Sequence, residues 1–122
     1  MDTHILLWSL SEPEKLPKKF RLELETLANV CLVSSVSIAE IMMKSSIGKL
    51  EIPFDPLSEA EAAGFEMMSF SGKDALPLKK LPYHHRDPFD RMLISQALVQ
   101  DLPIMTCDRK FSPYGCRLMT TT

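Results

Sequence analysis

The feature that most constrains the fold is a helix start inside the stretch HHRDPFDRMLISQALVQ, residues 84–100. Asp87 has the short acceptor side chain that is favoured at a helix N-cap. Pro88 suits the first helical position, where its missing N–H costs nothing. The pattern predicts a helix that begins at Pro88.

Asp90 lies on the apolar side of this predicted helix. Leu93, Ile94 and Ala97 follow it by three, four and seven residues, which is the spacing of one helical face. That face has to be buried, so the carboxylate emerges at the top of the core. An ordinary acid in the first turn would only favour the helix dipole, by about 0.3–1 kcal/mol. Whether Asp90 does more depends on the other acids of the chain.

Short apolar segments alternate with amphipathic ones along the chain. We expect a helix capped by Thr3, a helix from Lys18, a strand at 30–33, a helix from a Ser37/Glu40 capping box to Ile47, a helix at 57–63, a strand at 65–70, an interruption at Pro77 and a strand at 104–106. This alternation is typical of an α/β domain with a mainly parallel central sheet flanked by helices. A length of 122 residues predicts one domain, residues 1–122.

Composition excludes several classes of protein. The formal charge of −2 argues against a surface that holds nucleic acid by bulk attraction, so a nucleic-acid substrate would have to be held locally. No apolar run approaches a membrane span and no signal segment is present, which predicts a cytoplasmic protein. Three cysteines without a CxxC pair suggest neither a disulfide framework nor a cysteine zinc site.

Four acids fall where ligands bind in an open parallel sheet, at the ends of strands and the starts of helices: Asp2, Glu40, Asp90 and Asp108. Each also has a structural explanation; Glu40, for example, can complete its capping box or pair with Lys44. Clustered carboxylates repel one another unless a cation neutralises them, so a cluster implies a metal ion. Oxygen ligands suit Mg²⁺, with Mn²⁺ as the alternative, and the implied reaction is phosphodiester hydrolysis.

Four segments of the chain resemble the PIN-domain ribonucleases, specifically the VapC-type toxins of type II toxin-antitoxin systems. The segments are DTHILLW, SSVSIAEIMMKSSIGKLEIP, LPYHHRDPFDRMLISQAL and MTCDRKFSPYG, in the family's order and spacing. The third is the most specific. The resemblance covers nearly the whole chain and implies a compact sheet of parallel strands flanked by helices. Members usually carry several apolar residues before the first Asp; here only Met1 precedes Asp2, so that strand is either missing or encoded upstream.

The resemblance also implies a function and a set of site residues. Asp2, Glu40, Asp90 and Asp108 would hold Mg²⁺, with Asp2 and Asp90 as the principal ligands and Asp87 as a helix cap beside them. The substrate would be RNA, and a cognate antitoxin would insert a segment at the acidic pocket. Homodimers are usual in the family.

A basic and aromatic loop at residues 79–86 lies just upstream of Asp90. We predict that Lys80, Arg86 and the nearby Arg91 help to hold the RNA backbone. The bland interpretation, a solvated loop, stays open for each residue alone.

Three other functions are compatible with parts of the sequence. A degenerate PIN domain would bind RNA or a protein partner without cleaving. A phosphoacceptor receiver domain has similar length, but it needs a paired acid after the first strand and a lysine after the last, which DTH and TCDR do not supply. A zinc or other transition-metal site at His84 and His85 is disfavoured because adjacent side chains point to different sides.

Overall fold

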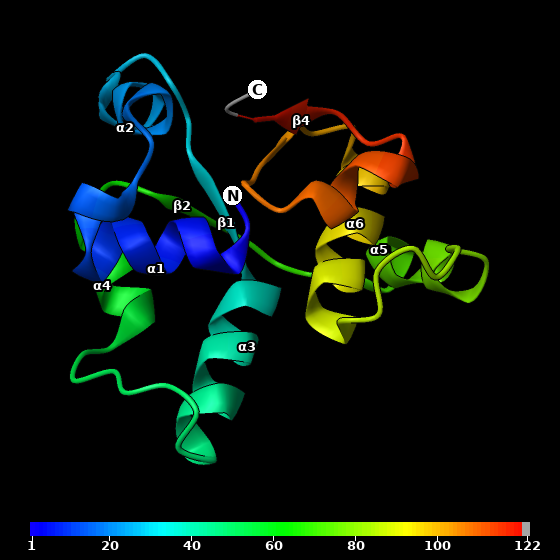
Figure 1. The fold of residues 1–122 in the computed structure, drawn as a ribbon, viewed down its shortest axis with the longest axis horizontal. Coiled ribbons are helices and arrows are strands. Elements are labelled where there is room, and N and C mark those ends of the chain that lie inside the picture. The colour runs from blue at the N-terminus through cyan, green and yellow to red at the C-terminus, as the bar shows by residue number, and fades with distance from the viewer. Residues whose placement is uncertain (121–122) are drawn as a thin grey trace.

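The computed structural model describes residues 1–120, so the last two residues of the expected domain lie outside the described part. In chain order the helices and strands are α1 (Thr3–Ser11), η1 (Pro13–Lys15), α2 (Lys18–Glu25), β1 (Leu32–Ser34), α3 (Ser35–Ser46), α4 (Pro56–Ala62), β2 (Glu66–Met68), α5 (Gly72–Ala75), η2 (Leu76–Lys79), α6 (Pro88–Gln100), β3 (Ile104–Met105), η3 (Arg109–Tyr114) and β4 (Leu118–Met119), where η marks a 3₁₀ helix (Figure 1). Among these described elements, no helix has the length and apolar character that a membrane crossing requires.

The strands form two parallel pairs. Strand β1 pairs with β2, with Val33 opposite Met67, and β3 pairs with β4. Helices α3 and α4 connect β1 to β2, and η3 connects β3 to β4, as parallel strands require a crossover. The expected α/β fold with parallel strands is therefore confirmed, but its sheet consists of two separate pairs.

The first two residues lie between the two strand pairs (Figure 1). The Met1 ammonium donates to the carbonyl of Leu32 in β1 at 3.3 Å, and the Asp2 N–H donates to the carbonyl of Met105 in β3 at 3.0 Å. Successive residues thus bond to opposite sides, as they do in a strand that is central to a parallel sheet. A pocket of about 270 Å³ continues from Met1 and is lined by Met1 and by residues of both strand pairs. The backbone hydrogen bonds of Met1 and Asp2 to the two strand pairs hold Asp2 in place.

Three apolar clusters form the core. The first joins α6 to β3 and η3 (Leu81, Ile94, Ala97, Ile104, Phe111, Tyr114), the second joins α1, β1, α3 and α4 (Leu6, Val33, Ile41, Ala60), and the third joins α1 to α2 (Ile5, Leu16, Phe20). The acids described below lie where the elements of the first two clusters meet.

The predicted start of the central helix is confirmed. Asp87 is the N-cap of α6, and its Oδ1 accepts the backbone N–H groups of Phe89 at 2.9 Å and Asp90 at 3.0 Å. Leu93, Ile94 and Ala97 are buried, as their spacing predicts. Asp90 is therefore in the first turn of α6, above the buried face.

Two predicted helix caps are wrong. Asp2 caps α1, and Thr3 is its first helical residue. Helix α3 begins directly after β1, so Ser34 is its cap and accepts the Val36 N–H at 3.2 Å. Ser37 consequently lies inside the helix, and Glu40 does not reach back to form the predicted capping box. The Glu40 carboxylate is therefore free to accept a hydrogen bond from Thr3 of α1.

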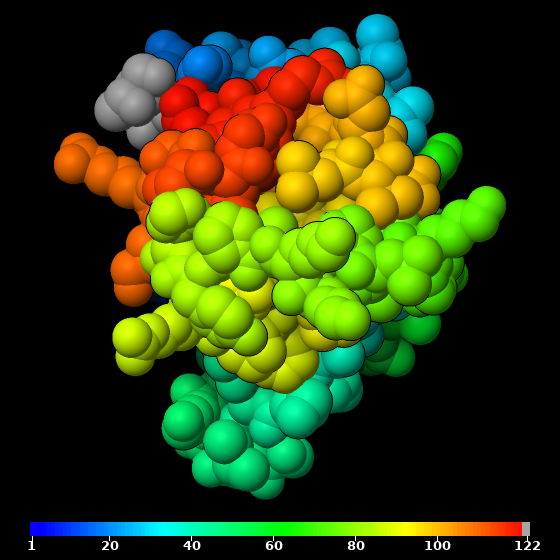
Figure 2. Space-filling model, turned by 90° about the vertical axis from the view of Figure 1, so that its right-hand side faces the viewer, coloured from blue at the N-terminus to red at the C-terminus, as the bar shows by residue number. Residues whose placement is uncertain are grey.

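The segment from Ser71 to Asp87 covers one face of the molecule, between α3 and the C-terminal segment (Figure 2). The predicted interruption at Pro77 is confirmed, because α5 ends at Ala75 and the 3₁₀ helix η2 follows. Its last part, residues 80–87, runs without regular structure into the α6 cap. This loop carries His85 to the acids.

Candidate functional site

Asp2 is 4% exposed and connects three segments. Its Oδ1 accepts the Ile5 N–H at 2.9 Å, which caps α1, and its Oδ2 accepts the Thr106 hydroxyl. The Thr106 Oγ1 also accepts the Asp108 N–H at 2.9 Å, so one buried hydroxyl links the first and last of the four acids. Burial raises the pKa of Asp2, and the Thr106 and Ile5 hydrogen bonds oppose this shift.

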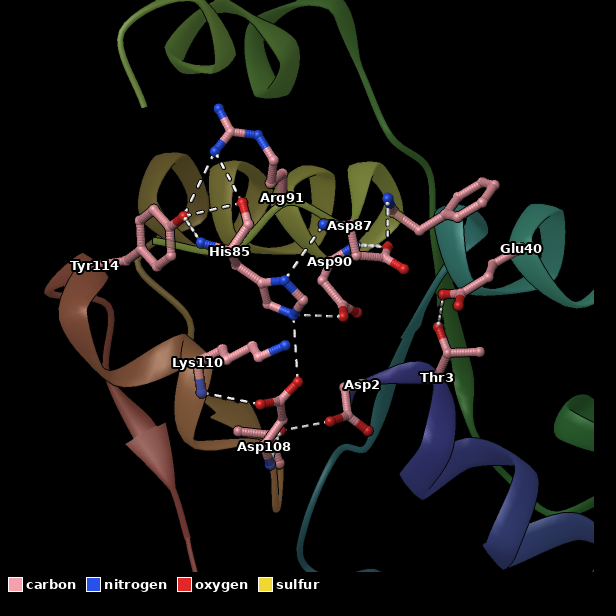
Figure 3. A network of polar contacts seen from close by, with 12 residues as sticks. Asp2, Thr3, Glu40, His85, Asp87, Asp90, Arg91, Asp108, Lys110 and Tyr114 are labelled. Carbon is pink, nitrogen blue, oxygen red and sulfur yellow. Dashed lines mark hydrogen bonds and ion pairs between the residues drawn. The ribbon is translucent and has the colours of Figure 1, made fainter. Parts of the chain in front are cut away.

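Glu40 is 3% exposed and projects from α3 toward the start of α1 (Figure 3). Its Oε1 accepts the Thr3 hydroxyl at 2.7 Å, and its Oε2 pairs with Lys44 one turn along α3. The predicted Glu40–Lys44 pair is therefore present. That hydrogen bond raises the pKa of Lys44, and the charges of Asp87 and Asp90 add to the shift. Lys44 is thus a cation near several of the acids.

Asp90 and Asp108 converge on a histidine ring (Figure 3). The His85 Nε2 lies 2.8 Å from the Asp90 Oδ2 and 3.2 Å from the Asp108 Oδ2. Asp108 caps η3, and its Oδ1 accepts the Lys110 N–H at 2.9 Å. Among residues 1–120, His85, Asp90 and Asp108 form a group whose possible ligand atoms all lie within 4.8 Å of one another.

The electrostatics of Asp90 draw the remaining acids into the same site. Its pKa is raised from 3.8 to about 7, first by burial and then by the negative charges of Asp87, Glu40, Asp2 and Asp108. Asp2 and Glu40 thus lie outside the compact group but close enough to act on its charge. The structure brings all four predicted acids to one region, where the charges of the other three act on Asp90.

The three predicted RNA-binding residues differ in exposure. Lys80 and Arg86 are exposed. Arg91 is 5% exposed; its guanidinium donates to the carbonyls of Leu81 at 2.9 Å and Pro82 at 2.8 Å and stacks on the Tyr83 ring at 3.8 Å. The cation of Arg91 therefore fixes the basic loop to α6, and any effect of Arg91 on RNA would act through that loop.

The sequence disfavours a metal site at His84 and His85 and does not single out Thr106. No local pattern points to either one, since His85 precedes the α6 cap in an irregular loop and Thr106 directly follows the two-residue strand β3. The two histidines differ in environment: His84 is exposed and its ring packs against Tyr114, whereas His85 is buried and its ring packs against Phe111. His85 alone of the pair faces the acids.

The donor set fits a hard divalent cation. Carboxylate oxygens are the ligands that Mg²⁺ and Mn²⁺ prefer, and the raised pKa of Asp90 marks a position where positive charge would be stabilising. Asp2, Asp90 and Asp108 sit at or beside the N-termini of α1, α6 and η3, where ligands of open α/β sheets bind. Fold and site together define an α/β protein with a candidate divalent-cation site built from acids.

The family of this protein follows from comparison with known proteins. A model of the PIN domain matches residues 1–115, nearly the whole chain, so the protein belongs to the PIN domain family. No curated protein sequence matches the chain.

Solved structures share this fold at low sequence identity. A chain of VapBC2 from Rickettsia felis, bound to a DNA fragment from its promoter, matches with a TM-score of 0.75 and 19% identity, covering 99% of this chain and 96% of that chain. A chain of DNA-bound VapBC from Salmonella typhimurium matches with a TM-score of 0.74 and 17% identity, covering 98% and 94%. At such identities the likeness establishes the fold, and the resemblance to PIN domains is confirmed.

Proposed function

We propose that this protein is a Mg²⁺-dependent endoribonuclease and the toxin of a type II toxin-antitoxin pair, acting on RNA in the cytoplasm. The observation that carries the proposal is the convergence of Asp2, Glu40 and Asp108 on Asp90. The pKa of Asp90 is raised to about 7, first by burial and then by the negative charges of Asp87 and these three acids. A buried carboxylate among other negative charges destabilises the fold in the absence of a cation, and a bound cation would remove this repulsion. A purely structural role for Asp90 does not explain that destabilisation.

Each acid would have a distinct role in the reaction. Asp2 and Asp90 would be the principal ligands, with Asp108 and Glu40 completing the acidic wall. A bound Mg²⁺ lowers the pKa of its water and offsets charge on the scissile phosphate. Thr106 would keep Asp2 and Asp108 in register through its two hydrogen bonds.

The RNA backbone would approach across the basic loop. Lys80 and Arg86 are exposed there, and the Lys110 side chain extends toward His85 and Asp108 (Figure 3). With a net charge of −2, the chain offers little attraction elsewhere, so these local cations would carry the binding.

A protein partner is part of the proposal. The two structural neighbours described above are chains of VapBC complexes, which supports a cognate antitoxin as the partner. This antitoxin would cover the acidic site. The family resemblance adds a homodimer as the expected assembly. The whole chain, residues 1–122, would act as one domain.

Cleavage assays test the enzymatic part directly. Purified protein is incubated with RNA and Mg²⁺, with EDTA, and as Asp90→Asn, beside the matched control Glu61→Gln, which removes an exposed carboxylate on α4. We expect cleavage to require Mg²⁺ and to fall about 100-fold or more in Asp90→Asn but not in the control. Cleavage that ignores both EDTA and the substitution would refute the proposal. RNA binding without cleavage would favour the degenerate PIN domain.

A further inference from the structure

His85 is held rigidly by contacts that do not involve the acids. It is 6% exposed, its backbone N–H donates to the Tyr114 hydroxyl at 2.7 Å, and its carbonyl accepts from Arg91 at 3.2 Å. The Tyr114 hydroxyl in turn donates to the Pro82 carbonyl at 2.7 Å. The His85 and Phe111 rings pack edge to face, with their centroids 5.7 Å apart. The ring orientation is therefore set by the packing of the loop on α6 and η3.

The backbone also determines which ring nitrogen carries the proton. The Asp87 N–H donates to the His85 Nδ1 at 3.3 Å, so Nδ1 acts as an acceptor. An imidazole whose Nδ1 accepts has its proton on Nε2. Since Nε2 faces the Oδ2 atoms of Asp90 and Asp108 at 2.8 and 3.2 Å, one N–H is shared between two carboxylates.

A hydrogen-bond donor shared by Asp90 and Asp108 can fix the distance between their carboxylates. Asp90 belongs to α6 and Asp108 to the cap of η3, so backbone connectivity does not fix the distance between their carboxylates. Their charges repel each other, and Asp108 contributes to the pKa shift of Asp90. A single rigid N–H between them opposes this repulsion and leaves the other lone pairs of both carboxylates available to a cation.

We propose that His85 is a positioning residue, which donates its Nε2–H to Asp90 and Asp108 and so holds these two carboxylates at the separation that a divalent cation requires. This inference rests on the proposed metal site and assigns His85 a place beside the ion's ligands. Partners of this kind, which hydrogen-bond to metal ligands, typically contribute 10–100-fold to metal affinity.

Metal titration of matched variants tests the assignment without any cleavage assay. Mn²⁺ affinity is measured calorimetrically for the wild type, His85→Asn, His85→Gln and the control His84→Asn, which removes the neighbouring exposed imidazole. A Gln amide reaches the position of Nε2, whereas an Asn amide reaches only that of Nδ1. We expect a loss of about 10–100-fold for His85→Asn, a loss of only a few-fold for His85→Gln, and no change for His84→Asn.

A second measurement separates positioning from direct coordination. Pulsed electron paramagnetic resonance of the Mn²⁺-loaded wild type should detect no directly bound imidazole nitrogen. Such a signal, together with equal losses for the Gln and Asn variants, would overturn the assignment and make His85 a ligand. Wild-type affinity in a folded His85→Asn variant would overturn it as well.

Tyr114→Phe provides a further route if His85→Asn does not fold. It removes the hydroxyl that holds the His85 N–H, and we expect weaker Mn²⁺ binding with the ring still present. Unchanged binding in this variant would count against the assignment. A wild type that binds no Mn²⁺ would refute this inference together with the metal site, whereas Mn²⁺ binding without RNA cleavage would refute only the nuclease proposal.

Discussion

Replacing Asp90 with Asn should stabilise the metal-free protein at alkaline pH while abolishing the proposed Mg²⁺-dependent cleavage. The pKa of Asp90 is raised from 3.8 to about 7, so the folded state binds this proton more tightly than the unfolded state. Stability must therefore fall as the pH rises from about 4 to about 7. At about 1.36 kcal/mol per pH unit, a shift of roughly three units corresponds to at most about 4 kcal/mol.

The expected gain is smaller than this limit, because solvent reaches part of the Asp90 side chain, which is 19% exposed. We expect Asp90→Asn to raise the free energy of unfolding by roughly 2–4 kcal/mol at pH 8 and by less than about 0.5 kcal/mol at pH 4. Asn keeps an oxygen that can accept the His85 Nε2–H, so the substitution removes charge with little change in packing.

Urea unfolding in EDTA at pH 4, 6 and 8 measures the effect, with Glu61→Gln as a control that removes an exposed charge. Adding Mg²⁺ at pH 8 should stabilise the wild type and leave Asp90→Asn nearly unchanged, because ligand binding stabilises only a protein that binds. A variant that is no more stable than the wild type at pH 8 would show that the acids do not repel one another as described. So would a gain of the same size at pH 4.

Three other variants probe the parts around this carboxylate. Thr106→Val should cost about 1–3 kcal/mol of unfolding free energy and weaken Mn²⁺ binding, because both hydrogen bonds of the buried Thr106 hydroxyl are lost at constant volume. Equal Mn²⁺ affinity would show that Thr106 does not order the acids. Arg91→Lys should lower stability by roughly 2–3 kcal/mol in urea unfolding, since one ammonium cannot serve all the carbonyls that the guanidinium reaches. The double variant Lys80→Ala with Arg86→Ala should leave stability unchanged, weaken RNA binding and reduce the salt dependence of that binding by about two phosphate contacts. The control Lys18→Ala on α2 should change neither the RNA affinity nor its salt dependence. An unchanged salt slope in the double variant would exclude the loop from the proposed RNA interface.

Sequence patterns predict structural features that depend on residues close together in the chain, such as the start of a helix. The Asp87-Pro88 pair predicted the start of α6 because cap and first-turn preferences act within four residues. The same reasoning was wrong at Ser37, since the cap of α3 is decided by where β1 ends, which is a matter of strand pairing. A serine pattern alone cannot report that pairing.

Features that depend on tertiary contacts were harder to predict. Arg91 was assigned to the basic surface because it follows a basic loop, yet it precedes the buried Ile94 by three residues and so shares its helical face. The helical spacing of Arg91 therefore predicts that the residue is buried, whereas its positive charge favours a surface position. The role of His85 had no comparable signal, because its ring meets Asp108 across 23 residues of chain.

The structural and functional explanations of the acids turn out to be compatible. Asp2, Asp87 and Asp108 each cap a helix, so backbone N–H groups at three helix N-termini offset their charge. Within residues 1–120, the Asp90 carboxylate accepts from His85 and from no backbone N–H. The charge left unbalanced by the fold is thus concentrated on Asp90, whose stabilisation by an added cation would be the largest. A chain selected for stability alone would place Asn or Ser at this position, so the acid itself is the reason to look for an ion there.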